Sequence, residues 1–182
     1  MAIDKTKEID KTENRHVIAA IVDNEFGVLA RVVGLFSGRG YNIESLTVAE
    51  ISSAKNLSRV TIVTSGTAQI IEQIKALLER LIPVHSVEDI SLGKPFVERE
   101  LALLKVTGQG ENRREALRMA DVFRAKVVDS TADSFVFEIT GTPSKLDAFI
   151  KLMQPLGLAE LCRTGIAAVQ RGVNYIGIDE HK

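Results

Sequence analysis

The chain has 182 residues, of which 45% are hydrophobic and 26% are charged, and its formal net charge is −1. A chain of this size and composition can bury one medium core or two small ones, and its periodic apolar content argues against disorder. The near-zero net charge gives no general electrostatic reason to bind nucleic acid or an anionic membrane. No apolar run approaches the roughly 20 residues that span a bilayer, and the N-terminus lacks the apolar core of a signal peptide. We therefore expect a globular protein of the cytoplasm.

The first fifteen residues are predicted to form a disordered, charged tail. Eight of them are charged, and Ile3-Asp4-Lys5-Thr6 recurs as Ile9-Asp10-Lys11-Thr12 without forming an apolar face. Such a segment buries too little surface to offset the entropy that it would lose on ordering.

Residues 16–92 predict a first β-α-β-β-α-β unit. Val28, Val32 and Phe36 form one helical stripe, and Gly38 ends that helix. In the second helix the apolar spacing extends to Ile82. The expected elements are a strand at 16–22, a helix at 27–37, a hairpin of strands at 41–50 and 57–65, a helix capped by Thr67 and stopped by Pro83, and a strand at 84–91.

The remainder of the chain repeats this order. The expected elements are strands at 101–107, 126–129, 135–140 and 159–164, a helix at 111–124, and a helix that opens with Thr142 as its cap and Pro143 in its first position. The fold class is therefore α+β, with two consecutive ferredoxin-like βαββαβ domains. The expected organisation is a tail at 1–15, a first domain at 16–92, a linker at 93–98, a second domain at 99–172 and a tail at 173–182.

Metal chemistry finds no support in the sequence. His16, His85 and His181 have no Cys, His or Glu partner at metal-ligand spacing. The single cysteine, Cys162, has no partner for an intramolecular disulfide, and its apolar context at 158–162 predicts that it packs in the core rather than acting as a reactive thiol.

Catalytic chemistry also lacks a suitable set of residues. Asp23, Glu25 and Glu44 could be imagined as an acid–base set, but all lie beside strand or helix ends, where solvated carboxylates are common. Gly108-Gln109-Gly110 lacks the third glycine and the acidic partner of a dinucleotide site. The central strand at 57–63 has no aromatic residue on which RNA bases could stack. We expect no catalytic site, which leaves ligand sensing and protein interaction.

A site for an amino acid is predicted where the first strand turns into the first helix. Asn24 is a good helix-capping residue and Gly27 has no Cβ, so the first-turn N–H groups stay open to a small anion such as a carboxylate. Asn42 opens the next strand and offers an amide oxygen to an ammonium group. These two ends fit an amino-acid zwitterion, although each residue also has a structural explanation as a cap, a tight turn or a bend.

Several segments closely resemble the small regulatory subunit of acetolactate synthase, also called acetohydroxyacid synthase. The similarity covers about residues 16–172, with Phe26 at a position that is usually proline or serine in that family. The matching segments are 24–32, 34–37, 39–48, 57–59, 97–105, 141–149, 163–165 and 171–172.

The resemblance implies a regulatory subunit without a catalytic site of its own. Its first domain would be an ACT domain that senses a branched-chain amino acid, most often valine, with leucine or isoleucine as alternatives. Catalysis would belong to a large subunit that carries thiamine diphosphate, Mg and FAD, none of which this chain would bind. The small subunit would activate that large subunit and confer feedback inhibition in valine, leucine and isoleucine biosynthesis.

The resemblance further implies a homodimer through the ACT domains, or a higher oligomer, with two effector sites at the interface. Asn24 and Gly27 of one chain would face Asn42 of its mate, and the predicted site also includes Val28, Leu29 and Ile43. The alternative is a free-standing sensor with tandem ACT-like domains that acts on another partner. The chain has no helix-turn-helix pattern, which argues against direct control of transcription in either case.

Overall fold

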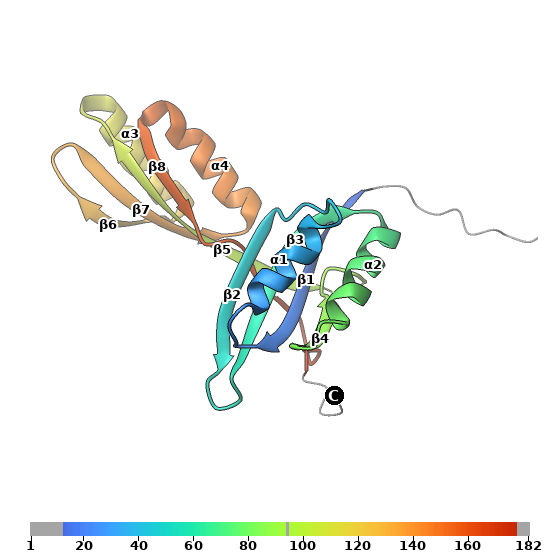
Figure 1. The fold of residues 1–182 in the computed structure, drawn as a ribbon. Helices are drawn as coiled ribbons and strands as arrows, with labels where there is room; N and C mark the ends of the chain where they lie inside the picture. The colour runs from blue at the N-terminus through green and yellow to red at the C-terminus, as the bar shows by residue number, and fades with distance from the viewer. Residues whose placement is uncertain (1–12, 94, 178–182) are drawn as a thin grey trace, which may run out of the picture. The chain divides into compact units, whose positions relative to one another are not determined.

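The computed structural model describes residues 13–93 and 95–177. The chain divides into two compact units, one formed by the described parts of Met1–Phe96 and Gln170–Lys182 and the other by Val97–Val169. In each unit two helices cover one face of a sheet whose paired strands are antiparallel (Figure 1). The predicted α+β class, with two consecutive βαββαβ domains, is confirmed.

The first sheet has the strand order β2-β3-β1-β4, so β1 and β3 are central and β2 is an edge strand. On β1, Ile18 lies between its partners Ile62 of β3 and Asp89 of β4. The elements are β1 (Asn14–Asp23), α1 (Val28–Ser37), β2 (Ser45–Ser52), β3 (Leu57–Gly66), α2 (Ala68–Glu79) and β4 (Val84–Asp89).

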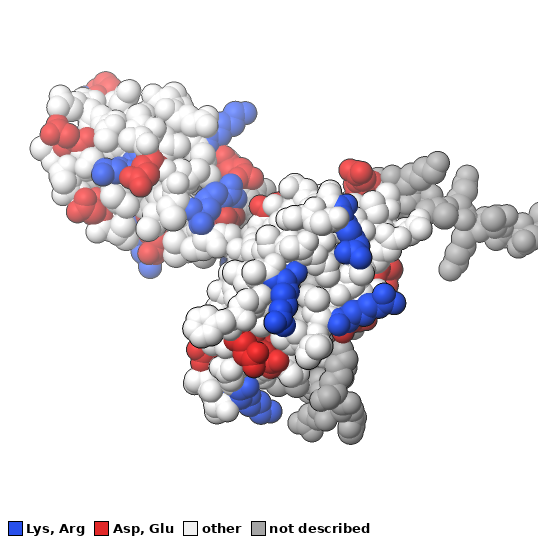
Figure 2. Space-filling view, in the orientation of Figure 1, with Lys and Arg blue, Asp and Glu red and all other residues white. Residues whose placement is uncertain are grey.

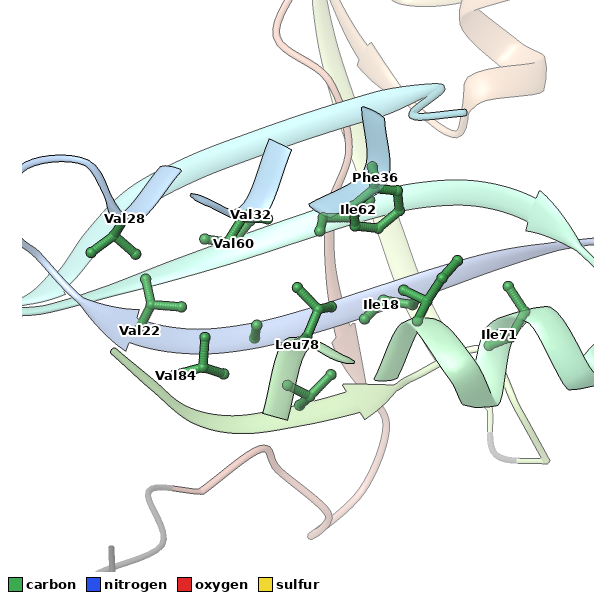
Figure 3. Close-up of a cluster of buried hydrophobic side chains, with 13 residues drawn as sticks. Ile18, Val22, Val28, Val32, Phe36, Val60, Ile62, Ile71, Leu78 and Val84 are labelled. Carbon is green, nitrogen blue, oxygen red and sulfur yellow. The ribbon is translucent and has the colours of Figure 1, made fainter. Parts of the chain in front are cut away.

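The core of this unit lies between the sheet and its two helices (Figure 3). Alternate residues of β1 and β3 point toward the helices, as the two-residue period of a strand requires. From α1, the predicted stripe of Val28, Val32 and Phe36 is buried. Phe36 is fully buried, and Phe36→Ala would cost about 3–5 kcal/mol of folding free energy through lost packing and a cavity.

The second sheet has the strand order β6-β7-β5-β8, and β9 also pairs with β5. Thr142 caps α4 as predicted, because its hydroxyl accepts from the Lys145 N–H, and Pro143 occupies the first turn. The elements are β5 (Phe96–Thr107), α3 (Gly110–Phe123), β6 (Lys126–Ser130), β7 (Ser134–Gly141), α4 (Pro143–Met153), a 3-10 turn (Gln154–Leu156), β8 (Leu158–Arg163) and β9 (Ala167–Gln170).

Several element boundaries differ from the predictions. Helix α2 is capped by Thr67 as expected but ends at Glu79, and the following Ile82 is 95% exposed rather than part of the apolar stripe. Ile82 lies at the spacing that would continue the apolar stripe. The helix has already ended before it, in a turn in which the Leu81 N–H donates to the Leu78 carbonyl. Strand β2 starts at Ser45, four residues later than expected, and β9 was not predicted.

The prediction that Cys162 packs in the core is wrong, because its side chain is exposed. Cys162 lies on β8 opposite Leu103 of β5, and that face of the sheet points away from the buried Leu104 and from the helices. The apolar sequence context cannot distinguish the covered face of an edge strand from the uncovered one.

The predicted tails lie largely outside the described residues, which exclude 1–12 and 178–182 and therefore also His181. Asn14 and Arg15, assigned to the N-terminal tail, belong to β1. Within 13–93 and 95–177, no group of three or more His, Cys, Asp or Glu side chains could hold a metal ion. No helix in the same ranges is long and apolar enough to cross a membrane.

Candidate functional site

The turn between β1 and α1 is built around Gly27. This residue occupies the N-cap position of α1 with a φ of 84°, a left-handed conformation that side-chain-bearing residues rarely adopt. No heavy atom would lie within 4 Å of a Cβ added there, so the space beside the turn is open. No side chain caps α1, and its first turn contains no acidic residue. The Val28 N–H donates to the Glu25 carbonyl at 3.4 Å, so the N–H groups that remain for an external anion are those of Leu29 and Ala30, which have no recorded acceptor among the described residues.

The predicted role of Asn24 as the helix cap is wrong. The N-cap is Gly27, three residues later, and the Asn24 amide instead donates to Oε2 of Glu50 at 3.4 Å. This contact ties the turn to the end of β2. Sequence reasoning did not include Glu50 in the site, since the two residues are 26 positions apart and nothing local links them.

The apolar residues of the turn differ in exposure. Val28 is 4% exposed and belongs to the core, whereas Leu29 is 43% exposed on the first turn of α1. Phe26, just before Gly27, is fully exposed. The turn thus offers open N–H donors beside apolar surface, which suits a small carboxylate that carries an aliphatic chain.

Asn42 and Ile43 occupy the segment between α1 and β2. Asn42 is exposed, and its carbonyl accepts a hydrogen bond from the Thr64 hydroxyl at 2.6 Å. Ile43 is partly buried and packs against the core of the first unit. The carboxamide of Asn42 therefore lies at the surface while its backbone is fixed to β3.

Within one chain the structure does not bring the two groups of predicted site residues together. The Asn24 N–H donates to the Asn56 carbonyl at 2.7 Å, just before β3, whereas Asn42 is bonded to Thr64 near the end of that strand. Eight residues of extended chain separate these contacts by roughly 25 Å. Asn24, Gly27, Val28 and Leu29 thus form one half-site, and Asn42 and Ile43 form another.

The three carboxylates considered as an acid–base set are also dispersed. Asp23 pairs with His85 Nε2 at 2.7 Å. Glu25 is exposed in the turn, and Glu44 accepts a hydrogen bond from the Ser65 hydroxyl near the far end of β3. Because these groups lie at both ends of β3, they do not converge on one substrate position.

Comparison with known proteins identifies the family of the whole chain. A family model described as "AHAS small subunit-like ACT domain" matches residues 18–86, and one described as "Small subunit of acetolactate synthase" matches residues 99–172.

Similar proteins include a probable acetolactate synthase small subunit of Archaeoglobus fulgidus, 46% identical over 87% of this chain and 98% of its own length. The small subunit of Aquifex aeolicus is 46% identical over 91% of this chain and 86% of its own length. The crystal structure of the small subunit from Thermotoga maritima has a TM-score of 0.81 and 39% identity, and the match covers 87% of this chain and 98% of that one. The chain belongs to the family of acetolactate synthase small subunits.

Proposed function

We propose that this protein activates a large, thiamine-diphosphate-dependent catalytic subunit and confers feedback inhibition by a branched-chain amino acid, with valine as the first candidate. Family membership supports the regulatory role and implies the large subunit as a partner. In this proposal Mg, FAD and thiamine diphosphate belong to the large subunit. The holoenzyme is a cytoplasmic transferase of valine, leucine and isoleucine biosynthesis, and this chain contributes no catalytic residue.

The observation that carries the effector site is the uncapped N-terminus of α1. Gly27 leaves the approach to the first N–H groups open, and no acidic side chain of the first turn competes with a ligand. A helix N-terminus carries a partial positive charge that favours an anion. The effector carboxylate would bind there, and its aliphatic chain would lie against Val28 and Leu29.

The positions of the two half-sites support an effector site shared between two chains. One half-site lies beside the end of β2 through the contact between Asn24 and Glu50, and the other, Asn42 and Ile43, lies just before the start of β2. Strand β2 is an edge strand with exposed Val48 and Ile51. Antiparallel pairing of two β2 edges would place the start of one strand beside the end of the other, and would thus join complementary half-sites at both ends.

The proposal keeps the division predicted from sequence. Residues 16–92 would form the effector-binding ACT domain and residues 99–172 the family-specific C-terminal domain, joined by a linker at 93–98. In the structure these bounds shift, because β5 already begins at Phe96 and Gln170 and Arg171 belong to the first unit. Coupling between the effector site and the catalytic subunit is expected to be about 1–3 kcal/mol, which changes activity several-fold to about a hundredfold.

The decisive experiment is to mix the purified chain with its large subunit and to measure acetolactate formation with and without valine, leucine or isoleucine. We expect no turnover of pyruvate by this chain alone, a higher rate for the mixture than for the large subunit alone, and inhibition by at least one of the amino acids. Turnover by the small chain free of large subunit would refute the regulatory assignment. Failure to associate with the large subunit would favour a free-standing sensor.

A further inference from the structure

A second surface of the first unit has the properties of a docking site. A groove of about 300 Å³ lies beside α2 and is lined by Arg39, Tyr41, Gln73, Ala76, Leu77 and Arg80. Arg39 and Tyr41 follow the C-terminal end of α1, at the other end of that helix from Gly27. Figure 2 shows Lys and Arg side chains over the helical face of this unit.

The groove presents hydrogen-bond donors around an apolar floor. Among the described residues, neither the Arg39 nor the Arg80 guanidinium has a recorded ion pair or hydrogen bond, and both side chains are exposed. The Tyr41 hydroxyl donates to Gln73 Oε1 at 3.3 Å. The NH₂ group of Gln73 therefore remains as a hydrogen-bond donor for another acceptor. Leu77 and the Tyr41 ring, which packs edge-on against Phe36, supply the floor. Two guanidinium groups and an amide NH₂ complement carboxylates.

We propose that this groove docks an acidic, partly apolar segment of the large catalytic subunit. The proposal rests on the proposed function, since it requires that a large subunit binds this chain. A protein segment fits better than a small molecule, because small-molecule sites bury most of their ligand whereas Arg39, Gln73, Ala76 and Arg80 on this groove are exposed. Arginines that pair with carboxylates beside an apolar floor are typical anchors of protein interfaces.

Charge reversal tests the groove in the full-length protein. Arg39→Glu and Arg80→Glu should each weaken association with the large subunit by about tenfold or more, and the double variant should also lose much of the salt dependence of association. Lys151→Glu is the matched control, because Lys151 is an exposed cation in the last turn of α4. Association is measured by analytical ultracentrifugation at several NaCl concentrations, and effector affinity of the small subunit alone by calorimetry, where no change is expected.

A cross-linking experiment identifies the occupant. Ala76→Cys in a Cys162→Ser background places a single thiol on the groove, to which a photoreactive cross-linker can be attached. An adduct with a large-subunit peptide that contains Asp or Glu supports the proposal, whereas an adduct with a second small subunit, or with a peptide lacking acidic residues, overturns it. Calorimetry with citrate tests a small-anion site, and citrate binding combined with unchanged subunit association in both Arg variants would also overturn it.

The two proposals fail in distinguishable ways. If the wild-type chain does not bind the large subunit, the proposed function itself fails. If wild-type protein binds and activates the large subunit while Arg39→Glu and Arg80→Glu behave like Lys151→Glu, only the docking site fails.

Discussion

At the scale of single residues, Gly27 combines two requirements. Its left-handed φ is needed to turn β1 into α1, and the empty space beside it leaves the helix N-terminus accessible. Gly27→Ala tests the first requirement, whereas Gly27→Asp adds a charge that competes with an effector carboxylate. Asparagine and aspartate both tolerate the left-handed region better than other side chains, so a comparison of Gly27→Asp with Gly27→Asn separates the effect of charge from that of conformation.

We expect Gly27→Asp to abolish feedback inhibition while activation of the large subunit persists. The new carboxylate would repel the effector carboxylate at the α1 N-terminus and occupy its space. Gly27→Asn, of the same shape without the charge, should weaken inhibition less. Titrating valine, leucine and isoleucine against the reconstituted enzymes measures this, and normal inhibition of the Gly27→Asp enzyme by any of them would rule out the site.

Arg163 stabilises the second unit through an ion pair with a buried carboxylate. Its Nε and Nη2 donate to the two oxygens of Glu100 at 2.8 and 2.6 Å, and its Nη1 donates to Asp147 at 2.7 Å. Glu100 is only 5% exposed. The hydrogen bond with Glu100 is the main reason that the pKa of Arg163 is raised. A raised pKa keeps the guanidinium charged, so its contribution to stability is not lost until pH exceeds the usual arginine range.

Arg163→Met should destabilise the protein by about 2–3 kcal/mol, because Glu100 would be left buried without its cation. Arg118→Met provides the control, since Arg118 pairs with Glu115 on the exposed face of α3, where water screens the two charges and the pair contributes little to stability. Urea unfolding measured at pH 7 and pH 9 compares the two variants. Equal destabilisation by the two substitutions would show that burial of Glu100 does not decide the energetics.

At the scale of elements, the β2 edge is the feature on which the proposed shared effector site depends. Its exposed Val48 and Ile51 accompany backbone groups that have no strand neighbour on one side. Natural edge strands that stay unpaired usually carry charges, Pro or bulges. Strand β2 has such features only near its C-terminal end, where Glu50 is exposed and the register with β3 shifts between Glu50 and Ser52, so its earlier part remains suited to pairing with a second copy.

Val48→Lys combined with Ile51→Lys should shift the protein from dimer toward monomer and weaken effector binding in parallel. Two like charges on each edge would face two on the mate. Val127→Lys with Val128→Lys, on the exposed strand β6, is the matched control and should leave dimerisation unchanged. Sedimentation and calorimetry on the same samples decide this, and a monomer with intact effector affinity would contradict a site shared between chains.

At the scale of the whole molecule, residues 170–177 are part of the first unit rather than of the unit that precedes them in sequence. Gln170 donates to Glu88 on β4, and the Arg171 N–H donates to the Pro95 carbonyl at 2.9 Å. The chain therefore enters the first unit, leaves it to build the second, and returns. Gln170 and Arg171 thus contribute hydrogen bonds to the first unit.

Truncation after Val169 should destabilise the first unit by about 1–3 kcal/mol, because two or three hydrogen bonds worth roughly 0.5–1.5 kcal/mol each are lost. Hydrogen exchange should accelerate in β4 and around Pro95 and remain unchanged in β7 of the second unit. Truncation after Ile176 is the control, since it retains Gln170 and Arg171. Faster exchange in β7 alone would contradict the assignment of this segment to the first unit.

The sequence by itself determined the local elements and the family. Alternating apolar residues and 3.6-residue stripes encode which face of a strand or helix is buried, and caps such as Thr67 and Thr142 act within three residues of themselves. Such signals are local, so the order of elements in both units, apart from β9, followed from them. The tight turn at Gly27 is also a local property, and in the structure Gly27 has a left-handed φ of 84°.

Only the tertiary structure decided the features that depend on distant segments. The exposure of Cys162, the pairing of Asn24 with Glu50 and the return of residues 170–171 to the first unit all depend on residues far away in the chain. The separation of Asn24 from Asn42 by the length of β3 has the same origin. Local sequence patterns predict that a strand forms. They do not predict which strand pairs with it or which of its faces stays uncovered, because both depend on the strand order and register of the sheet.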